Sequence, residues 1–312
     1  MYYPYFRGKQ YELVLIKEQA QLLADNKIIP IIEPVKLNLN PLERALVSLN
    51  EADANYILIA NPANGDFIND STPLFKFIQT LDKENITVGL IVKESSSLSE
   101  IERLIDMYSN FPIAIIHQGF TKGKELSDLI QSKSHHNIPL NIFVSLESNK
   151  LYQKHFKNIG ERIWVRDAFN KRKNANYPKN EHFSELHLTY EDEGMDGFGD
   201  FLTVGDDYSE SGGPAWAVAI HMTYFDKEQN MFINHYVSDR QDDNKDAGGK
   251  FLEALNYLVA DENRNKFFNT KASEEYIELH KKQLFRGLGY AKKLSMQNHL
   301  EIIAKFLESN NE

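Results

Sequence analysis

The sequence predicts an α/β fold, a TIM-like (β/α)8 barrel in which parallel strands alternate with helices. Short apolar runs recur at intervals of about 25 residues, and a polar, helix-like stretch separates most neighbouring runs. The runs are mostly apolar without strict alternation, which is typical of strands buried on both faces of a parallel sheet. An open doubly wound sheet with a C-terminal helical part is the rival prediction.

The regular part of the predicted barrel consists of six strands and the helices around them. The strands are residues 28–34, 56–62, 86–92, 112–118, 139–145 and 162–168. The helices are residues 10–26, 41–49, 72–83, 98–108, 124–132 and 150–158. Pro41 and Pro73 stand in the first turn of their helices, where the missing N–H of proline costs no hydrogen bond. These helices are long enough to cross back over a parallel sheet.

Beyond residue 168 the alternation becomes irregular. Residues 170–181 are polar and predict an exposed loop, and residues 182–190 predict a short helix. The seventh and eighth runs are residues 197–208 and 216–225, and the segment between them is too short for a crossover helix. The barrel is therefore expected to be irregular between strands 7 and 8.

The rest of the chain predicts one more strand and a helical end. Residues 231–237 predict a strand that forms a hairpin with the eighth run. Residues 248–312 are the predicted C-terminal helices. No change of composition and no Pro/Gly/Ser-rich linker marks a boundary. We therefore expect a single domain over residues 1–312, with residues 248–312 as its helical part.

The composition excludes several kinds of site and partner. The 312 residues contain no cysteine, which excludes disulfides, thiolate metal ligands and a cysteine nucleophile. Lys and Arg number 35 against 45 Asp and Glu, so the net charge of −10 argues against nucleic acid as a partner. No apolar stretch reaches roughly 20 residues, and the N-terminus lacks a secretory signal. We therefore expect a cytoplasmic protein without membrane contact.

Polar side chains stand at the C-terminal ends of the runs. A (β/α)8 barrel brings these ends together at one mouth, where its active site lies. In chain order the polar residues are Glu33, Lys36, Asn61, Asn64, Lys93, Glu94, His117, Gln118, Ser145, Glu147, Arg166, Asp167, Asp206, Asp207, His221 and Thr223.

Three of these residues are candidates for acid–base catalysis: Glu33, Asp167 and His221. A carboxylate at the end of a barrel strand is typical of an active site. The alternative for Glu33 is a structural role, because a carboxylate in so apolar a run must be paired. Lys36 or Arg166 could be that partner. The alternative for His221, which has apolar neighbours, is a core histidine with satisfied hydrogen bonds.

Five basic residues are candidates for holding an anionic small molecule: Arg7, Lys9, Lys36, Lys93 and Arg166. Lys93 follows the third run directly, so it is also a candidate for a Schiff base, or else an ordinary loop lysine. Arg7 and Lys9 belong to the aromatic N-terminal segment YYPYFRGKQYE. Its aromatic side chains either plug one end of the barrel, with the basic side chains reaching inward, or only cap the fold.

A candidate Mg²⁺ site follows the seventh run, at Asp206 and Asp207. Mg²⁺ prefers a few carboxylates together with water molecules. Glu33 and Asp167 would complete such a site at the barrel mouth. The alternative is that Asp206 and Asp207 are loop acids beside a glycine-rich turn. The common short motifs of phosphate loops, zinc proteases, nucleophile elbows and calcium loops are absent from the sequence.

The opening Y-P-Y-F-R-G-K-Q-Y-E, followed by a helix and the I-I-P-I-I-E-P strand, resembles the Beta-protein family of phages and bacteria. The resemblance extends to G-F-G-D-F before Leu202 and to I-H-M-T-Y in the eighth run. Members of this family occur in phages and in mobile or defence-associated bacterial loci. The resemblance therefore implies a role in phage defence or phage immunity together with a neighbouring-gene protein. It transfers no catalytic residue.

Two functions are expected from these observations. One is a TIM-barrel scaffold in a bacterial phage-defence system, acting with a partner protein. The alternative is a barrel enzyme or sensor for a phosphorylated or otherwise anionic small molecule, with Mg²⁺ as the candidate cofactor. As an enzyme it would be a hydrolase or a lyase, with carboxylates at the strand ends as acid and base.

Overall fold

The computed structural model describes residues 1–133, 135–145, 149–210, 215–265 and 267–311, so Glu147 of the polar set lies outside the described residues. The chain divides into two compact units. The barrel unit comprises Met1–Asp167 and Leu186–Asp200, and the second unit comprises Ala168–Glu185 and Phe201–Glu312. The sequence indicated one domain. The composition of the sequence does not change where one unit meets the other, because each unit has an apolar core of its own.

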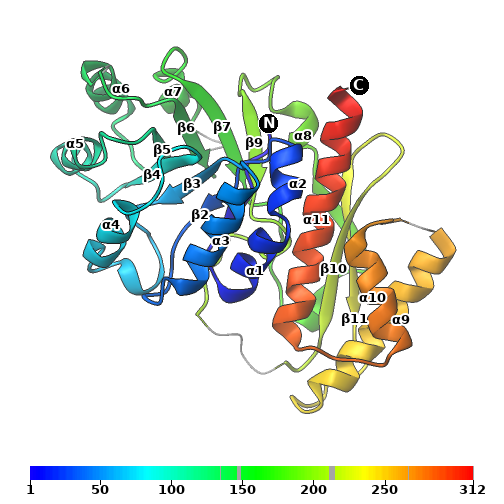
Figure 1. The fold of residues 1–312 in the computed structure, drawn as a ribbon. Coiled ribbons are helices and arrows are strands. Elements are labelled where there is room, and N and C mark those ends of the chain that lie inside the picture. Colours follow the sequence, from blue (N-terminus) through cyan, green and yellow to red (C-terminus); the bar gives the residue numbers. More distant parts are fainter. Residues whose placement is uncertain (134, 146–148, 211–214, 266, 312) are drawn as a thin grey trace. The chain divides into compact units, whose positions relative to one another are not determined.

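The barrel unit contains an eight-stranded parallel sheet with helices between its strands, which confirms the TIM-like α/β prediction (Figure 1). The order of the strands in the sheet is their order in the chain. They are β1 (Tyr5–Phe6), β2 (Ile31–Ile32), β3 (Tyr56–Ile59), β4 (Ile86–Lys93), β5 (Ile113–Gln118), β6 (Leu140–Val144), β7 (Glu161–Arg166) and β9 (Gly197–Asp200).

The aromatic N-terminal segment is the first strand of this sheet. It pairs with β2 on one side, through the register Tyr5–Ile31 and Phe6–Ile32. On the other side a parallel bridge joins Tyr2 to Phe198, and the backbone N–H of Tyr3 donates to the carbonyl of Phe198 at 2.8 Å. The segment therefore joins β2 to β9 as a strand of the sheet.

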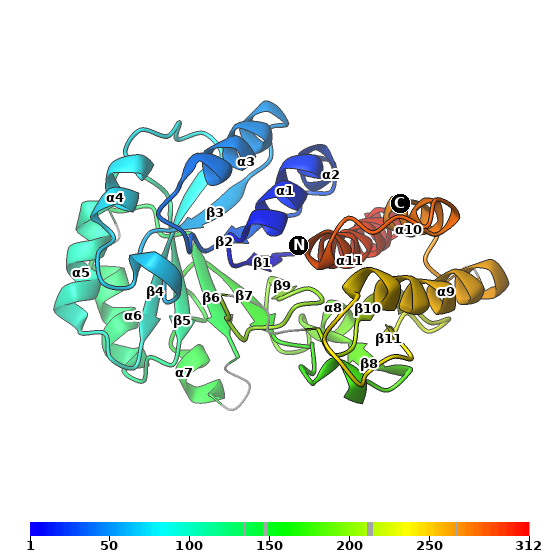
Figure 2. The ribbon, with the colours of Figure 1, turned by 90° about the horizontal axis from the view of Figure 1, so that it is seen from below.

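Helices α3 to α6 lie around the outside of the strands (Figure 2). The serine N-cap of α5, Ser97, accepts a hydrogen bond from the backbone N–H of Glu100 at 3.2 Å. The helices of the barrel unit are α1 (Gln10–Glu18), α2 (Ala20–Asp25), α3 (Asn40–Glu51), α4 (Thr72–Ile78), α5 (Leu98–Met107), α6 (Gly123–Ser132), α7 (Lys150–Lys154) and α8 (Leu186–Thr189), with a 3₁₀ turn at Gly65–Phe67.

Gly89 in β4 shows which side chains face the barrel interior. A Cβ atom there would lie 2.9 Å from the side chain of Ile116 and 3.1 Å from those of Ile57 and Ile59. The opposite face of β5 carries His117, which contacts Tyr152 of α7 outside the barrel. Because strand side chains alternate, the interior face continues to Glu33, Asn61, Lys93 and Gln118 at the C-terminal ends of their strands.

The second unit contains a separate three-stranded antiparallel sheet in the order β10–β11–β8. Its elements are β8 (Asn180–Ser184), β10 (Ala219–Phe225), β11 (Met231–Val237), α9 (Ala247–Asn265), α10 (Lys271–Lys281), α11 (Leu288–Asn311) and a 3₁₀ turn at Asn174–Asn176. The predicted hairpin between the eighth run and residues 231–237 is confirmed by the register from Ala219–Val237 to Phe225–Met231.

Two predictions beyond residue 168 are wrong. The eighth run is not a barrel strand, because Ile220 and Met222 of β10 are buried in a core that α9, α10 and α11 share with this sheet. Residues 182–190 do not form one helix: they begin in β8 and end in the short α8. In the described part of the chain, no helix is long and apolar enough to cross a membrane.

Candidate functional site

Glu33 is the centre of a buried hydrogen-bond network at the mouth of the barrel. Its side chain is fully buried, and Arg7, which is 5% exposed, forms a salt bridge with Oε2. The hydroxyl of Tyr5 donates to the same oxygen at 2.9 Å. Oε1 accepts from the backbone N–H groups of Ala63 at 2.8 Å and Asn64 at 2.9 Å, and from Nδ2 of Asn64 at 3.1 Å.

These contacts favour the structural alternative for Glu33. An ionised carboxylate offers about four lone-pair sites, and the donors around Glu33 occupy them. No site is left for a substrate proton or a metal ion. The partner of Glu33 is Arg7, and not Lys36 or Arg166 as the sequence suggested. Glu33 thus ties β1, β2 and the loop after β3 together.

The loops around Glu33 are packed backbone against backbone. Gly8 has φ +60°, and a Cβ atom there would lie 2.7 Å from the carbonyl oxygen of Glu33. Gly65 has φ +79°, and its Cβ would lie 2.2 Å from the carbonyl oxygen of Val35. Both positions therefore require glycine, for the positive φ and for the close approach. The loops at β1, β2 and β3 are therefore closely packed at the rim of the barrel.

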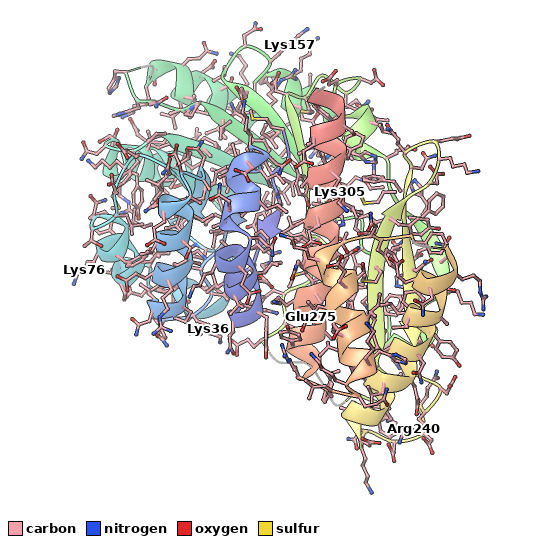
Figure 3. All side chains as sticks on the ribbon, turned by 45° about the vertical axis from the view of Figure 1, so that its right-hand side comes forward. Lys36, Lys76, Lys157, Arg240, Glu275 and Lys305 are labelled. Carbon is pink, nitrogen blue, oxygen red and sulfur yellow. The ribbon has the colours of Figure 1, made fainter. Side chains whose placement is uncertain are left out.

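A cavity of about 440 Å³ lies at this rim. Its lining is mostly apolar and comes from the start of α1 and from the loop between β2 and α3. Lys36, labelled in Figure 3, lies in this lining and faces Asp66 with 3.6 Å between Nζ and Oδ1. The lining residues are Gly8, Gln10, Leu13, Pro34, Val35, Lys36, Asn38, Leu39, Pro41, Leu42 and Asp66.

Lys9 lies at the N-cap of α1, where its role is tied to Glu12 in the first turn. The carboxylate of Glu12 accepts hydrogen bonds from the backbone of Arg7 and Lys9, as in the second half of a capping box. Burial raises the pKa of Glu12 to about 7, although these hydrogen bonds and the charges of Lys9 and Arg7 oppose the shift.

Lys93 and Gln118 are neighbours on the interior face, at the ends of β4 and β5. They are register partners in the parallel ladder, and both are partly exposed. Oε1 of Gln118 is buried and has no hydrogen-bond partner among the described residues. Asn61, on the preceding strand, exchanges two hydrogen bonds of 2.8 Å with the backbone of Ile91. Lys93 and Gln118 are therefore two side chains at this mouth that a ligand could reach.

The last strands of the barrel place their polar residues on different faces. Arg166 is the register partner of Asp200, on the outer face of β7. Asp167 follows as the last residue of this segment of the barrel unit and is partly exposed. Strand alternation puts Asp167 on the interior side, with Val165. Of the five predicted basic ligands, Lys93 is the one whose strand position directs it into the barrel mouth without a carboxylate partner in the described chain.

His117 has a structural role that its position at a strand end did not reveal. Its Nδ1 lies 2.7 Å from the hydroxyl of Tyr152, and its Nε2 lies 3.1 Å from Oδ1 of Asn141. The ring stacks on Phe143 with 4.6 Å between centroids. Burial lowers the pKa of His117 to about 3, so the imidazole is neutral near pH 7.

The predicted Mg²⁺ ligands come from both units of the chain. Glu33 and Asp167 belong to the barrel unit, whereas Asp206 and Asp207 belong to the second unit. Asp207 is exposed and faces Lys171, with 3.6 Å between Nζ and Oδ2. Throughout the described ranges, no group of three or more His, Asp or Glu side chains has the arrangement that would hold a metal ion.

His221 lies in the second unit and forms a cross-strand pair with His235. This pair and its neighbours Glu181 and Arg172 cannot be predicted from single runs, because they meet only when the eighth run pairs in the hairpin and not in the barrel. The register of the predicted hairpin could have revealed the pair. Counting residues back from the turn on both strands places His221 of I-H-M-T-Y opposite His235 of I-N-H-Y.

No protein-family model matches this chain. No curated protein matches it either. Among solved structures, the chain is similar to the crystal structure of N-acetylneuraminate lyase from Mycoplasma synoviae, with a TM-score of 0.39 and 13% sequence identity. The similarity covers 64% of this chain and 67% of the lyase chain. It says nothing about the activity of this chain.

Proposed function

We propose that this protein is a cytoplasmic binding component of a bacterial phage-defence or phage-immunity system, with the barrel unit as a scaffold for a partner protein from a neighbouring gene. The defence context follows from the resemblance of the N-terminal segment and the eighth run to the Beta-protein family. The observation that supports docking is the apolar cavity at the barrel rim, which has exposed apolar side chains beside it.

Leu37 and Ile68 are the exposed apolar side chains next to the cavity. They are 57% and 56% exposed, on the loops after β2 and β3. The backbone N–H of Leu37 donates to Oδ2 of Asp66 at 3.0 Å, and that of Asp66 to the carbonyl of Val35 at 3.0 Å. The two loops are therefore held together before any partner binds, which lowers the entropy cost of docking. An apolar pocket with an exposed apolar rim suits an apolar anchor side chain of a partner.

The test is the double variant Leu37→Glu/Ile68→Glu. Two carboxylates at the rim will weaken binding to the neighbouring-gene protein by at least about tenfold, because they must be desolvated on docking. Binding is measured by titration of the purified proteins, and protection by phage plating on cells that carry both genes. The matched control is Leu151→Glu, at an exposed leucine on α7. Equal affinity and equal protection in the double variant and the control would contradict the docking proposal.

A second candidate function is supported by Lys93 and Gln118. The ammonium of Lys93 would hold an anionic group, and a ligand hydroxyl would give the buried Oε1 of Gln118 the donor it lacks. A phosphorylated or carboxylated small molecule with hydroxyl groups combines both features. In this alternative the protein is a sensor of such a molecule, or an enzyme of the hydrolase or lyase class.

Inorganic phosphate is the probe for the second candidate. Phosphate will raise the melting temperature of the wild type, and Lys93→Ala will reduce that increase because the cation is lost. Lys124→Ala serves as the control, since Lys124 is an exposed lysine on α6 that pairs with Asp128. The same increase in Lys93→Ala and Lys124→Ala would show that phosphate does not bind at Lys93.

A further inference from the structure

A chain of hydrogen bonds crosses the three-stranded sheet of the second unit and ends at His221. Arg172 donates to both carboxylate oxygens of Glu181, at 2.7 and 2.8 Å. Nε2 of His235 lies 3.1 Å from Oε1 of Glu181. On the other side of its ring, Nδ1 of His235 lies 2.7 Å from Nδ1 of His221. Glu181, His235 and His221 come from β8, β11 and β10, so the sheet itself positions the chain.

The protonation state of Glu181 determines the direction of every hydrogen bond in this chain. Burial raises the pKa of Glu181, but hydrogen bonds from Arg172 and His235 outweigh it, and the pKa is lowered overall. Glu181 is therefore a carboxylate near pH 7 and can only accept. His235 must then donate from Nε2. Burial lowers the pKa of His235, so its ring is neutral and its Nδ1 accepts.

His221 must in turn donate from Nδ1 to His235. Burial, followed by the electrostatic interactions with His235 and Lys292, holds the pKa of His221 well below its ordinary value, so this ring is neutral too. A neutral imidazole has one N–H, and that N–H is on Nδ1. Nε2 of His221 consequently carries an available lone pair, and it makes no hydrogen bond with any residue that the structure describes.

The surroundings of His221 combine aromatic rings with basic side chains. The ring of Tyr177 stacks on His235 and meets His221 edge-on, with 4.6 Å between the centroids in both pairs. The ring of Phe169 lies 5.0 Å from that of His221. The charged and titratable groups that act on His221 are His235 on β11, Lys292 on α11 and, through His235, Glu181 on β8 with its partner Arg172. Lys292 is exposed.

We infer that Glu181, His235 and His221 form a general-base site, in which Nε2 of His221 takes a proton from an O–H group of an anionic ligand. The O–H bond breaks with its electron pair left on oxygen, and an N–H bond forms at Nε2. The Nδ1 proton of His221 can then move along the hydrogen bond of 2.7 Å to His235. The positive charge thereby ends beside the carboxylate of Glu181, which stabilises it.

The positive charge of Lys292 is the reason why we infer an anionic ligand. Its ammonium is near enough to lower the pKa of His221, so an anion bound beside it would offset this effect. The pKa of His221 would rise on binding, and the base would become stronger when the ligand is present. This inference rests on the second unit alone and is independent of the docking cavity at the barrel rim.

The tautomers are tested first, by ¹⁵N NMR of the full chain with labelled histidine side chains. We expect His221 to carry its proton on Nδ1 and His235 to carry its proton on Nε2 near pH 7. Histidine variants at each position assign the signals. An Nε2–H tautomer of His221 would overturn the inference, because the lone pair would then be directed at His235.

Diethyl pyrocarbonate, which acylates unprotonated imidazole nitrogens, tests the reactivity of Nε2. We expect rapid modification of His221, several-fold slower modification in Glu181→Gln and His235→Gln, and an unchanged rate in His182→Gln. His182 is an exposed histidine on the same sheet and serves as the control. An unreactive His221, or equal rates of modification in all variants, would overturn the inference. If only one of Glu181→Gln and His235→Gln folds, that variant is sufficient for the comparison.

Inorganic phosphate tests the class of ligand in the same assay. In the wild type, phosphate will bind beside Lys292 and thereby protect His221 from modification by diethyl pyrocarbonate. In Lys292→Ala this protection will be lost, while the tautomer of His221 will stay the same. Modification of wild-type His221 at the same rate with and without phosphate would overturn the assignment of an anionic ligand.

Discussion

Glu33→Ala will lower the free energy of unfolding of the barrel unit by about 3–5 kcal/mol. The substitution leaves the guanidinium of Arg7 buried without its carboxylate. It also removes the acceptor of Tyr5 and of the backbone N–H groups of Ala63 and Asn64. Each buried donor that loses its acceptor keeps its full desolvation cost. Urea unfolding followed by circular dichroism measures the change.

The matched control for this prediction is Glu43→Ala, which removes an exposed glutamate from α3. We expect its effect to stay within about 0.5 kcal/mol, as for other exposed charges. A double-mutant cycle with Arg7→Ala tests the pair itself: the losses of the two single variants will exceed the loss of the double variant. A Glu33→Ala protein as stable as Glu43→Ala would contradict the structural role of Glu33.

His117 will make the barrel unit sensitive to acid. Burial lowers its pKa to about 3 in the folded protein, against an ordinary value of 6.5. Between these two values the unfolded chain binds the proton that the folded protein excludes. The stabilisation is therefore complete above pH 6.5 and is lost as the pH falls toward 3. Linkage gives a loss of about 3 kcal/mol between pH 7 and pH 4 from this residue.

The comparison of His117→Gln with the wild type isolates this effect. Glutamine can still hydrogen-bond with Tyr152 and Asn141, but it does not take up a proton. The variant will be less stable at pH 7, because it loses the stacking on Phe143, and the difference from the wild type will shrink as the pH falls to 4. His182→Gln, at an exposed position, is the control for the unfolding series. A constant difference between wild type and His117→Gln across the range would show that His117 is protonated in the folded protein.

The apolar runs were predictable as barrel strands, and the first barrel strand was not. Runs such as residues 86–92 are almost entirely apolar, because both faces of a parallel strand are covered. The first strand is the pair Tyr5–Phe6, preceded by Pro4, and such a short segment has no periodicity to detect. It becomes a strand only because the edges β2 and Phe198 supply partners for its backbone groups.

The candidate site, too, was predictable from the sequence only in part. The position of Glu33 at a strand end was predictable, and so was its need for a partner. The partner was not predictable, because Arg7 reaches Glu33 only when strand alternation and barrel closure put both side chains on the interior face. His221 was found as a candidate, but His235 and Glu181 are 14 and 40 residues away and meet it through strand register alone.

The sequence by itself determined the parallel (β/α) alternation, the strand ends that carry polar groups and the hairpin of the second unit. These follow from local periods and from turn chemistry, which a short stretch of chain contains. Only the tertiary structure decided which strand closes the barrel, that the chain forms two units, and that Glu33 is saturated while Nε2 of His221 is not. The reason is that hydrogen-bond saturation depends on donors from distant segments, and their distances are set by the packing of the whole unit.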